Sequence, residues 1–315
     1  MTDFKFMTPI PVAYLYPPVA APWEFNGTPE QMVRAIQKAD EVGFDMMNMP
    51  DHIIMPRESL DLMSPRWGEA VSTLAFITGA SKRLKAYTTI LIMPYRNPLL
   101  LAKALATIDY LSGGRVMLGT AIGHEEREFA LLGVPFEERA AITDEYIRAL
   151  RELWTNEDPH FDGKYVSFHD VAFEPRPTQK GGIPVIIGGN SRPAQRRAAR
   201  LGDGWHPWLI ARKDLPSCID YIKTQPEFVA NPRPFEVFMP LAPINVDEDH
   251  VPQGETKIPF ERDQLIEEIE ELISVGATGT IVSIPPTETF EEYLHHMEFF
   301  GREVLPRFKK QPASA

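Results

Sequence analysis

Cysteine is almost absent from this chain of 315 residues, because Cys218 is the only one. A single cysteine excludes an intramolecular disulfide and a cysteine-based metal cluster, and we expect Cys218 to be a small buried hydrophobe. Excess positive charge is absent as well, since 44 acidic residues against 32 Lys and Arg residues leave a net charge of −12. This charge argues against general nucleic-acid binding and against docking on anionic membrane surfaces.

Long hydrophobic runs are also missing from the sequence. No apolar run is long enough to span a bilayer. The N-terminal segment MTDFKFMTPI lacks the basic region and the long apolar region of a signal peptide. We therefore expect a cytoplasmic protein that binds neither nucleic acid nor membrane and takes a small-molecule substrate.

What the sequence does contain is a regular alternation of strand-like and helix-like segments. Hydrophobic residues make up 43% of the chain, which is enough for a large core. Each strand candidate is followed by a helix candidate, so the pattern predicts an α/β fold, a parallel (β/α)₈ TIM barrel, rather than a doubly wound sheet. No repeat or linker marks a second domain, and we expect one barrel domain over residues 1–315. The eight strand candidates are residues 4–9, 44–50, 84–93, 115–120, 183–187, 204–206, 235–245 and 279–284.

Helix starts are marked by capping residues. Thr28 and Gln31 have the spacing of a capping box, and Pro29 suits the first helical position. Thr289 and Glu292 repeat the capping-box spacing before the final helix.

Three longer connections interrupt this regular pattern. They are insertion loops near residues 53–66, 159–182 and 246–259. We expect a hairpin within residues 161–173, because Asp162-Gly163 is a turn pair. Substrate choice depends on these loops, so the sequence does not identify the substrate.

Glycines stand where apolar strands end and helices begin. Gly119 and Gly123 follow one strand, and Gly188 and Gly189 follow another. Glycine lets a ligand approach the backbone closely, and a helix N-terminus offers N–H groups to a phosphate. The alternative is an ordinary tight turn at each junction.

These residues belong to an ordered set of motifs that covers about two-thirds of the chain. The set resembles the bacterial luciferase-like family of flavin- and deazaflavin-dependent oxidoreductases, a family of (β/α)₈ barrels with insertions. The matching pieces are Gly43-Phe44-Asp45, Asp51-His52, Leu111-Ser112-Gly113-Gly114-Arg115, Leu118-Gly119 through Gly123, Gly133-x-Pro135-Phe136-x-x-Arg139, Asp144-Glu145, Leu153-Trp154, Gly188-Gly189-Asn190-Ser191 and Ala198-Ala199-Arg200-x-Gly202-Asp203-Gly204-Trp205.

The resemblance implies a cofactor that lies across the carboxyl ends of the strands. It places a non-prolyl cis peptide at Thr89-Ile90, against the cofactor ring; the alternative is that this segment is simply a buried strand. It also makes the turn after the fifth strand the phosphate site. The implied cofactor-binding residues are Thr89, Ile90, Gly119, Ile122, Gly123, His124, Ile187, Gly188, Gly189, Asn190 and Ser191.

His52 is the best acid–base candidate. It follows a strand end and stands beside Asp51, an acceptor that we expect to orient the imidazole. The resemblance places it at a position that faces the substrate, whereas the alternative is a structural histidine at the rim. Trp205, His206 and Trp208 are expected to line the substrate pocket, although the tryptophans alternatively pack in the top of the barrel.

His124 departs from the family pattern, because some deazaflavin-dependent relatives have a carboxylate at this place. The departure argues against a sugar phosphate as the substrate. Arg192 begins a helix with four arginines that we expect to form a solvated face, and it alternatively contacts a phosphate or a polyglutamate tail.

The resemblance leaves two cofactors open. The deazaflavin coenzyme F420 carries carbon where FMN has its central ring nitrogen, so it passes hydrides and reacts poorly with oxygen. The overall pattern is most similar to the deazaflavin branch, which predicts hydride transfer to or from a carbonyl, alcohol, imine or activated alkene. The alternatives are an FMN-dependent monooxygenase with a separate reductase and a non-catalytic flavin-binding protein.

The resemblance also implies a homodimer. No metal site is expected, because only Asp51-His52 approaches a metal-ligand pattern.

Overall fold

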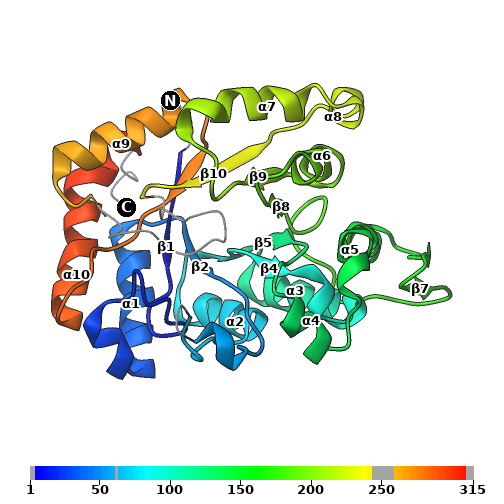
Figure 1. Cartoon of the computed structure of the whole chain (residues 1–315), viewed down its shortest axis with the longest axis horizontal. Coiled ribbons are helices and arrows are strands. Elements are labelled where there is room, and N and C mark those ends of the chain that lie inside the picture. Colours follow the sequence, from blue (N-terminus) through cyan, green and yellow to red (C-terminus); the bar gives the residue numbers. More distant parts are fainter. Residues whose placement is uncertain (1–3, 61–62, 243–258, 310–315) are drawn as a thin grey trace.

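The computed structural model describes residues 4–60, 63–242 and 259–309, and within them the chain forms a closed parallel barrel surrounded by helices (Figure 1). The hydrogen-bonded order is β3-β2-β1-β11-β10-β9-β8-β5, and a further pairing of β3 with β5 closes the ring. The fold class predicted from the alternating pattern is therefore confirmed. The barrel strands are β1 (Lys5–Pro9), β2 (Met46–Met49), β3 (Lys85–Thr88), β5 (Val116–Ala121), β8 (Val185–Gly188), β9 (Gly204–His206), β10 (Glu236–Pro240) and β11 (Gly279–Ile281).

The third predicted strand, residues 84–93, is divided in the structure. Its second part is β4 (Leu91–Ile92), which pairs with β5 at Thr120 and Ala121. The break between β3 and β4 is the Thr89-Ile90 peptide bond, which is cis. The strand predicted at 235–245 is shorter in the structure, because β10 ends at Pro240. Residues 243–245 of this prediction lie outside the described residues.

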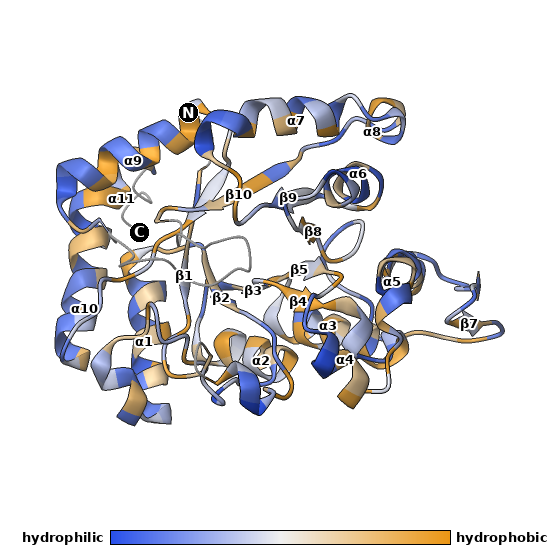
Figure 2. Ribbon diagram, in the orientation of Figure 1, coloured by the Kyte–Doolittle hydropathy of each residue, from blue (hydrophilic) through white to orange (hydrophobic). Residues whose placement is uncertain are grey.

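Helices cover the outside of the barrel and follow the strands in the predicted order. The capping box of Thr28 with Gln31 is present, and so is that of Thr289 with Glu292. In Figure 2, α6 is largely hydrophilic, as its four arginines require. The helices are α1 (Pro29–Val42), α2 (Ala70–Ala80), α3 (Pro98–Ser112), α4 (Glu126–Leu131), α5 (Arg139–Thr155), α6 (Arg192–Leu201), α7 (Leu215–Lys223), α8 (Pro226–Ala230), α9 (Arg262–Ser274), α10 (Phe290–Phe299) and α11 (Leu305–Phe308).

The core has two parts, because side chains of a strand alternate between the two faces of the sheet. One cluster fills the barrel interior, and a larger one packs between the strands and the helices. Cys218 on α7 is buried in the larger cluster, as expected. The interior cluster consists of Met7, Met46, Tyr87, Met117, Ile186 and Phe238.

The predicted hairpin is present and projects from the body of the barrel (Figure 1). It pairs β6 (Phe161–Asp162) with β7 (Ser167–Phe168) in antiparallel fashion. Glu145 of α5 is buried and accepts the backbone N–H groups of Lys164, Tyr165 and Val166, which fixes the hairpin turn.

Two of the predicted loops are described only in part. In the loop 53–66, residues 61–62 lie outside the described residues. In the loop 246–259, the same is true of every residue except Pro259. Over the part of the chain that the structure describes, no helix combines the length and the apolar character that crossing a membrane requires.

Candidate active site

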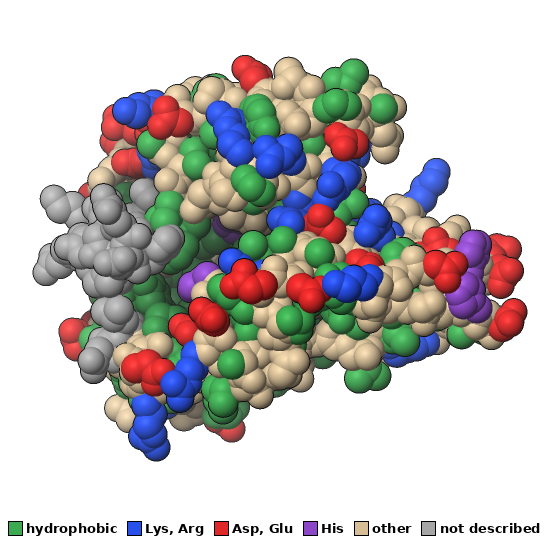
Figure 3. All heavy atoms as spheres, turned by 45° about the vertical axis from the view of Figure 1, so that its right-hand side comes forward, with side chains coloured by type: hydrophobic (Ala, Val, Ile, Leu, Met, Phe, Trp, Pro, Cys, Tyr) green, Lys and Arg blue, Asp and Glu red, His purple; other side chains and the backbone are tan. Residues whose placement is uncertain are grey.

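The carboxyl ends of the strands form the mouth of the barrel, where barrel enzymes place their active sites. Figure 3 shows a hollow in this region that is lined by hydrophobic side chains, with histidine side chains at its edge. The residues predicted from the sequence reach this mouth from the ends of β2, β3, β5, β8 and β9.

The cis peptide implied by the resemblance is present at Thr89-Ile90. Asn48, at the inner face of β2, donates from its Nδ2 to the hydroxyl of Thr89 over 2.6 Å. The other amide atom, Asn48 Oδ1, is buried and has no hydrogen-bond partner. A buried acceptor without a donor is costly, so this oxygen is a place for a ligand N–H group.

Gly188 connects the cis peptide to the turn at the end of β8. A Cβ atom on Gly188 would lie 3.0–3.3 Å from the side chain of Ile90, so the absence of a side chain lets Ile90 pack there. Gly188 also pairs in register with His206 of β9. Ile90, Gly188 and His206 are therefore neighbours at one side of the mouth.

The turn after β8 leads into α6 as predicted, and β8 is the fifth strand of the barrel along the chain. Gly189 has a φ of 117°, and Ser191 caps α6 by accepting the N–H of Ala194. The side chain of Asn190 accepts the N–H groups of Trp208 and the next residue, over 2.8 and 3.0 Å. Asn190 thus fixes the following loop, and the N–H groups at the start of α6 remain the phosphate-binding element of the prediction.

His52 lies directly after β2 and pairs with Glu128 of α4. His52 Nδ1 is 3.0 Å from Glu128 Oε2, and the side chains are 15% and 0% exposed. The other carboxylate oxygen accepts the backbone N–H groups of Ile53 and Ile54, over 2.5 and 3.0 Å. The hydroxyl of Tyr95 donates to Glu128 Oε2 over 3.0 Å.

Four hydrogen bonds keep Glu128 ionised although it is buried. Burial alone raises the pKa of Glu128, but the hydrogen bonds from His52, Ile53 and Ile54 outweigh it, and the net effect lowers that pKa below its ordinary value. Burial, together with the charge of Glu128, raises the pKa of Tyr95, so that its hydroxyl stays a donor. Because an ionised carboxylate only accepts, the proton between the two groups sits on His52 Nδ1, which leaves Nε2 for proton exchange.

Sequence reasoning missed Glu128. Gly123 makes its position possible, because a Cβ atom there would lie 2.7 Å from Ile92 and 2.8 Å from Phe129. The short helix α4 can therefore approach the barrel and insert Glu128 and Phe129, which are both fully buried. The signal in the sequence is weak: Glu128 is one of three glutamates in four residues, and only Phe129 beside it marks the buried face. His124 is exposed just before this helix.

The prediction that Asp51 orients His52 is wrong. Asp51 is buried, and both of its oxygens accept from the guanidinium of Arg96, each over 2.7 Å. Asp51 Oδ2 also accepts the N–H of Ile92 over 2.9 Å. The carboxylate therefore ties the end of β2 to the segment after the cis peptide. Asp51 is thus a positioning residue.

The two tryptophans predicted to line the substrate pocket have different surroundings. Trp205 is fully buried in the outer cluster and donates from Nε1 to the carbonyl of Gly189 over 2.8 Å. It supports the turn from behind, so its predicted place in the wall of a substrate pocket is wrong. Trp208, by contrast, is 38% exposed and is free to meet a ligand.

His206 lies inside the barrel rather than at an open rim. It is 6% exposed, and its Nδ1 is 2.8 Å from the hydroxyl of Tyr87. Burial lowers the pKa of His206 to about 4 and raises that of Tyr87 well above its ordinary value, so both are neutral near pH 7. Tyr87 must donate to Nδ1, since its proton would otherwise be buried without an acceptor among the described residues. His206 therefore carries its proton on Nε2.

Three of the four arginines of α6, namely Arg192, Arg196 and Arg200, are exposed as expected, and Arg197 is the exception. Arg197 and Arg200 both make ion pairs with Asp144 of α5, and Arg197 is buried. Arg192, at the helix start, lies over the ring of Tyr221 at 4.2 Å from the centroid. Of the four arginines, Arg192 is the nearest in sequence to the predicted phosphate turn.

The mouth of the barrel fits a flavin-type cofactor. The unpaired oxygen of Asn48 needs an N–H donor, and the pyrimidine ring shared by flavins and deazaflavins carries one. The start of α6 suits a phosphate. Within the described residues, no group of three or more His, Cys, Asp or Glu side chains is placed to hold a metal ion.

Comparisons with known proteins agree with this geometry. A family model described as "Luciferase-like monooxygenase" matches residues 7–242. The protein Rv0940c of Mycobacterium tuberculosis is 28% identical over 288 residues, which cover 85% of this chain and 92% of that protein.

Two relatives with stated activities use different cofactors. The F420-dependent glucose-6-phosphate dehydrogenase of Amycolatopsis mediterranei is 34% identical over 184 residues, covering 56% of this chain and 53% of that enzyme. The FMNH(2)-dependent dimethylsulfone monooxygenase of Pseudomonas putida is 36% identical over 141 residues, covering 44% of this chain and 38% of that enzyme.

Solved structures show the same fold. The monooxygenase RslO1 from Streptomyces bottropensis has a TM-score of 0.75 at 20% identity, over 97% of this chain and 100% of that one. The coenzyme F420-dependent tetrahydromethanopterin reductase from Methanopyrus kandleri has a TM-score of 0.74 at 18% identity, over 98% and 100%.

Proposed function

Because the chain belongs to the luciferase-like monooxygenase family, we propose that it is an oxidoreductase that transfers a hydride between coenzyme F420 and a small organic substrate. The substrate class is a carbonyl or alcohol, an imine or an activated alkene. The observation that carries the proposal is the pair formed by His52 and Glu128 at the mouth of the barrel. Hydride transfer to or from a carbonyl or alcohol requires one proton, and this pair exchanges one.

The proton chemistry follows from the hydrogen bonds of the pair. When bound, the deazaflavin supplies a ring carbon that accepts or donates a hydride. For an alcohol, the carbon-bound hydrogen leaves as a hydride while the hydroxyl proton moves to His52 Nε2, and a ketone or aldehyde forms. Glu128 keeps the other proton on Nδ1 and stabilises the imidazolium that results.

The remaining residues hold the cofactor and shape the floor of the site. Asn48 Oδ1 would accept an N–H group of the ring, and the N–H groups at the start of α6 would bind the phosphate. Asp51 fixes the segment that follows Ile90 through the N–H of Ile92. His206 offers a neutral N–H group, because its pKa of about 4 keeps it uncharged.

Coenzyme F420 is favoured over FMN on the proton pair and on the longer match to an F420-dependent relative, 184 residues against 141. The second candidate function is an FMN-dependent monooxygenase, and the relative from Pseudomonas putida supports it. That function would need a separate reductase to supply reduced FMN. We extend the expectation of a homodimer to both functions, and analytical ultracentrifugation tests it.

The deciding experiment is a fluorescence titration of the apoprotein with oxidised F420 and, separately, with FMN. We expect micromolar or tighter binding of F420 and at least tenfold weaker binding of FMN. Tight binding of FMN alone would replace this proposal with the monooxygenase.

A matched pair of glycine variants locates the phosphate site. Gly189 and Gly181 have φ angles of 117° and 85°, so alanine is strained at both positions. Only Gly189 belongs to the turn before α6. We expect G189A to weaken F420 binding more than tenfold and G181A to change it less than twofold, whereas equal effects would show that the turn is only structural.

A further inference from the structure

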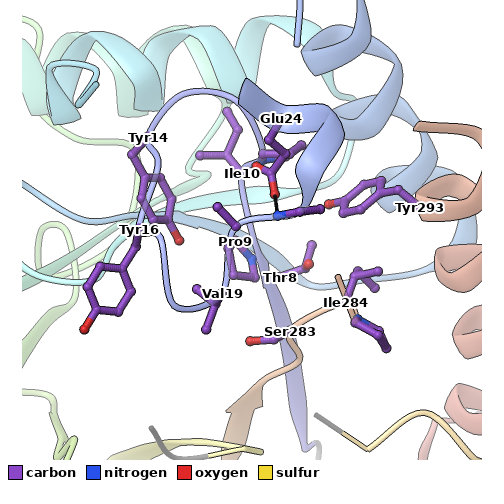
Figure 4. A pocket seen from close by; sticks show the side chains of 14 residues that line it. Thr8, Pro9, Ile10, Tyr14, Tyr16, Val19, Glu24, Ser283, Ile284 and Tyr293 are labelled. Atoms are coloured by element: carbon purple, nitrogen blue, oxygen red, sulfur yellow. Dashed lines mark hydrogen bonds between the residues drawn. The ribbon is translucent and has the colours of Figure 1, made fainter. Parts of the chain in front are cut away.

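A second pocket opens at the mouth of the barrel, on the side away from the cofactor turn (Figure 4). It lies between the segment after β1 and the segment after β11, and its cavity volume is about 50 Å³. A space of this size holds a short group of a few heavy atoms, since one water needs roughly 10–15 Å³ by the same kind of measure. Its polar lining residues are Thr8, Tyr14, Tyr16, Glu24, Ser283 and Tyr293.

His52 stands between this pocket and the cofactor-binding residues. The barrel order is β3-β2-β1-β11, so the end of β2 separates the cis peptide after β3 from the pocket. The edge of the His52 ring contacts Trp67 with 4.7 Å between centroids. Trp67 in turn stacks on Tyr14, a wall of the pocket, at 5.3 Å. Trp67 therefore lies between His52 and the wall of the pocket, and a molecule that reacts beside His52 reaches the pocket by extending past the Trp67 ring.

The pocket contains a polar group without a partner. Thr8 is fully buried, and its hydroxyl makes no hydrogen bond. The hydroxyl of Tyr293 lies beside it, and this contact with Thr8 lowers the pKa of Tyr293 against the larger effect of burial. Because a buried hydroxyl without a partner is costly, a ligand with a polar end that enters the pocket can gain affinity by bonding to Thr8.

The charges around the pocket select against anions. Among the described residues no Lys or Arg lines it, and Glu24 is the one formally charged residue of the lining. The nearby Arg66 is exposed and donates to the backbone carbonyls of Glu24 and Phe25. Both oxygens of Glu24 are engaged by backbone N–H groups, from Val12 over 2.9 Å and from Ala21 over 3.0 Å. Burial raises the pKa of Glu24, while the two N–H groups and the charge of Arg66 oppose this rise only in part. A phosphate, sulfonate or carboxylate placed here would be desolvated beside the carboxyl group of Glu24, without a Lys or Arg among the described lining residues.

The backbone of this wall is held in an unusual conformation. Val12 has a φ of 67°, which β-branched residues rarely adopt. The bond from its N–H to Glu24 and the packing of its side chain against Gly27 keep it there. Backbone strain of this kind concentrates where a fold shapes a binding site.

We infer that this pocket binds the end of the substrate that does not react, and that this end is a short uncharged group with hydrogen-bonding capacity, such as a hydroxyl. The inference rests on the proposed function for the reacting end and adds the substrate's far end. Thr8 and Ser283 pair with the hydroxyl, and the tyrosines enclose it. Substrates that end in a phosphate or carboxylate are excluded.

Three methyl ketones of similar length test the inference. Acetopropanol ends in a hydroxyl, levulinate ends in a carboxylate, and methyl propyl ketone ends in a methyl group. Ligand-detected NMR titration measures their millimolar affinities without turnover. We expect acetopropanol to bind at least tenfold more tightly than levulinate and several-fold more tightly than methyl propyl ketone. Equal or tighter binding of levulinate would overturn the inference.

Two threonine variants separate the pocket from the fold. Thr280 is a second fully buried threonine whose hydroxyl has no partner, and it does not line the pocket. We expect T8V to weaken acetopropanol binding about three- to tenfold and to leave methyl propyl ketone unchanged, whereas T280V changes neither. If T8V and T280V behave alike, the hydroxyl of Thr8 is structural and the inference fails.

The test stays informative in two further cases. If T8V does not fold by circular dichroism, S283A takes its place with the same expected loss for acetopropanol. The cofactor titration is independent of these measurements. A protein that binds neither F420 nor FMN but prefers acetopropanol contradicts the proposed function and retains the pocket, whereas the reverse result contradicts the pocket alone.

Discussion

His52 and His206 both stand at the mouth of the barrel, but their partners differ. His52 faces an ionised carboxylate, Glu128, and is 15% exposed. His206 faces the neutral hydroxyl of Tyr87 and is 6% exposed. An anionic partner stabilises an imidazolium, whereas burial beside a neutral partner prevents one from forming.

This difference assigns the two histidines different roles. In the proposed function, His52 exchanges a proton with the substrate at Nε2 while Glu128 compensates the charge. His206 stays neutral because burial lowers its pKa to about 4, so it acts as a fixed N–H donor. The type of residue is thus the same, and the partner decides the chemistry.

Removing His52 is expected to have the largest effect. With a ketone or alcohol that the wild-type protein turns over, H52Q should lower the rate about 10²–10⁴-fold, as for other acid–base groups. F420 affinity should stay within about threefold, because His52 is not placed among the cofactor-binding residues. H169Q, at an exposed histidine of the β6–β7 hairpin, serves as the control. An unchanged rate for H52Q would remove His52 from the mechanism.

Removing only the charge of its partner should have nearly as large an effect. In E128Q the neutral amide keeps one acceptor oxygen, which cannot serve both the donors His52 and Tyr95 and the backbone N–H groups that Glu128 Oε1 accepts. We expect turnover to fall about 10²-fold, measured under the same conditions. The matched variant E126Q changes an exposed glutamate of the same helix and should behave like the wild type. Equal rates for E128Q and wild type would mean that Glu128 only fixes the loop.

His206 should make the stability of the fold depend on pH. The unfolded imidazole binds its proton near pH 6.5 and the folded one near pH 4, so between these values the unfolded state holds more protons. The contribution of the neutral His206 to the free energy of unfolding is complete above pH 6.5 and is lost as the pH falls toward 4. Between pH 6.5 and 5 the free energy of unfolding should fall by about 2 kcal/mol from this group.

Urea unfolding at several pH values measures this dependence. H206Q should have a slope smaller by that amount over the same interval. The prediction fails if H206Q and the wild type lose stability in parallel, because another group would then be responsible.

The smallest expected effect is that of the hydroxyl of Tyr87. Y87F leaves His206 Nδ1 buried without its donor and should lower the free energy of unfolding by about 1–2 kcal/mol in chemical denaturation. Y110F, at a tyrosine that is 56% exposed on α3, should change it by less than about 0.5 kcal/mol. Equal stabilities of Y87F and the wild type would show that the hydrogen bond between Tyr87 and His206 Nδ1 does not stabilise the fold.

The sequence predicted the barrel because its signals are local. Caps such as Thr28 and glycine turns such as Gly188-Gly189 depend on a few neighbouring residues, so the order of the elements was readable. The cis bond at Thr89-Ile90 came from the family resemblance instead.

The partners of the site residues were not readable, because they come from distant segments. Glu128 is 76 positions from His52, and the adjacent Asp51 is bound by Arg96, 45 positions away. Trp205 and His206 show a different lesson, since neighbouring residues of a strand face opposite sides. Assigning both to one pocket ignored that alternation; the outer face holds Trp205, and the barrel interior holds His206.

The contrast between the two histidines is tested most directly by nitrogen-15 NMR of histidine-labelled protein at pH 8, with H52Q and H206Q used to assign the signals. The predicted result is a proton on Nδ1 of His52, and a neutral ring with its proton on Nε2 for His206. A His52 ring without a proton on Nδ1 would contradict the account, because that ring could not donate to Glu128.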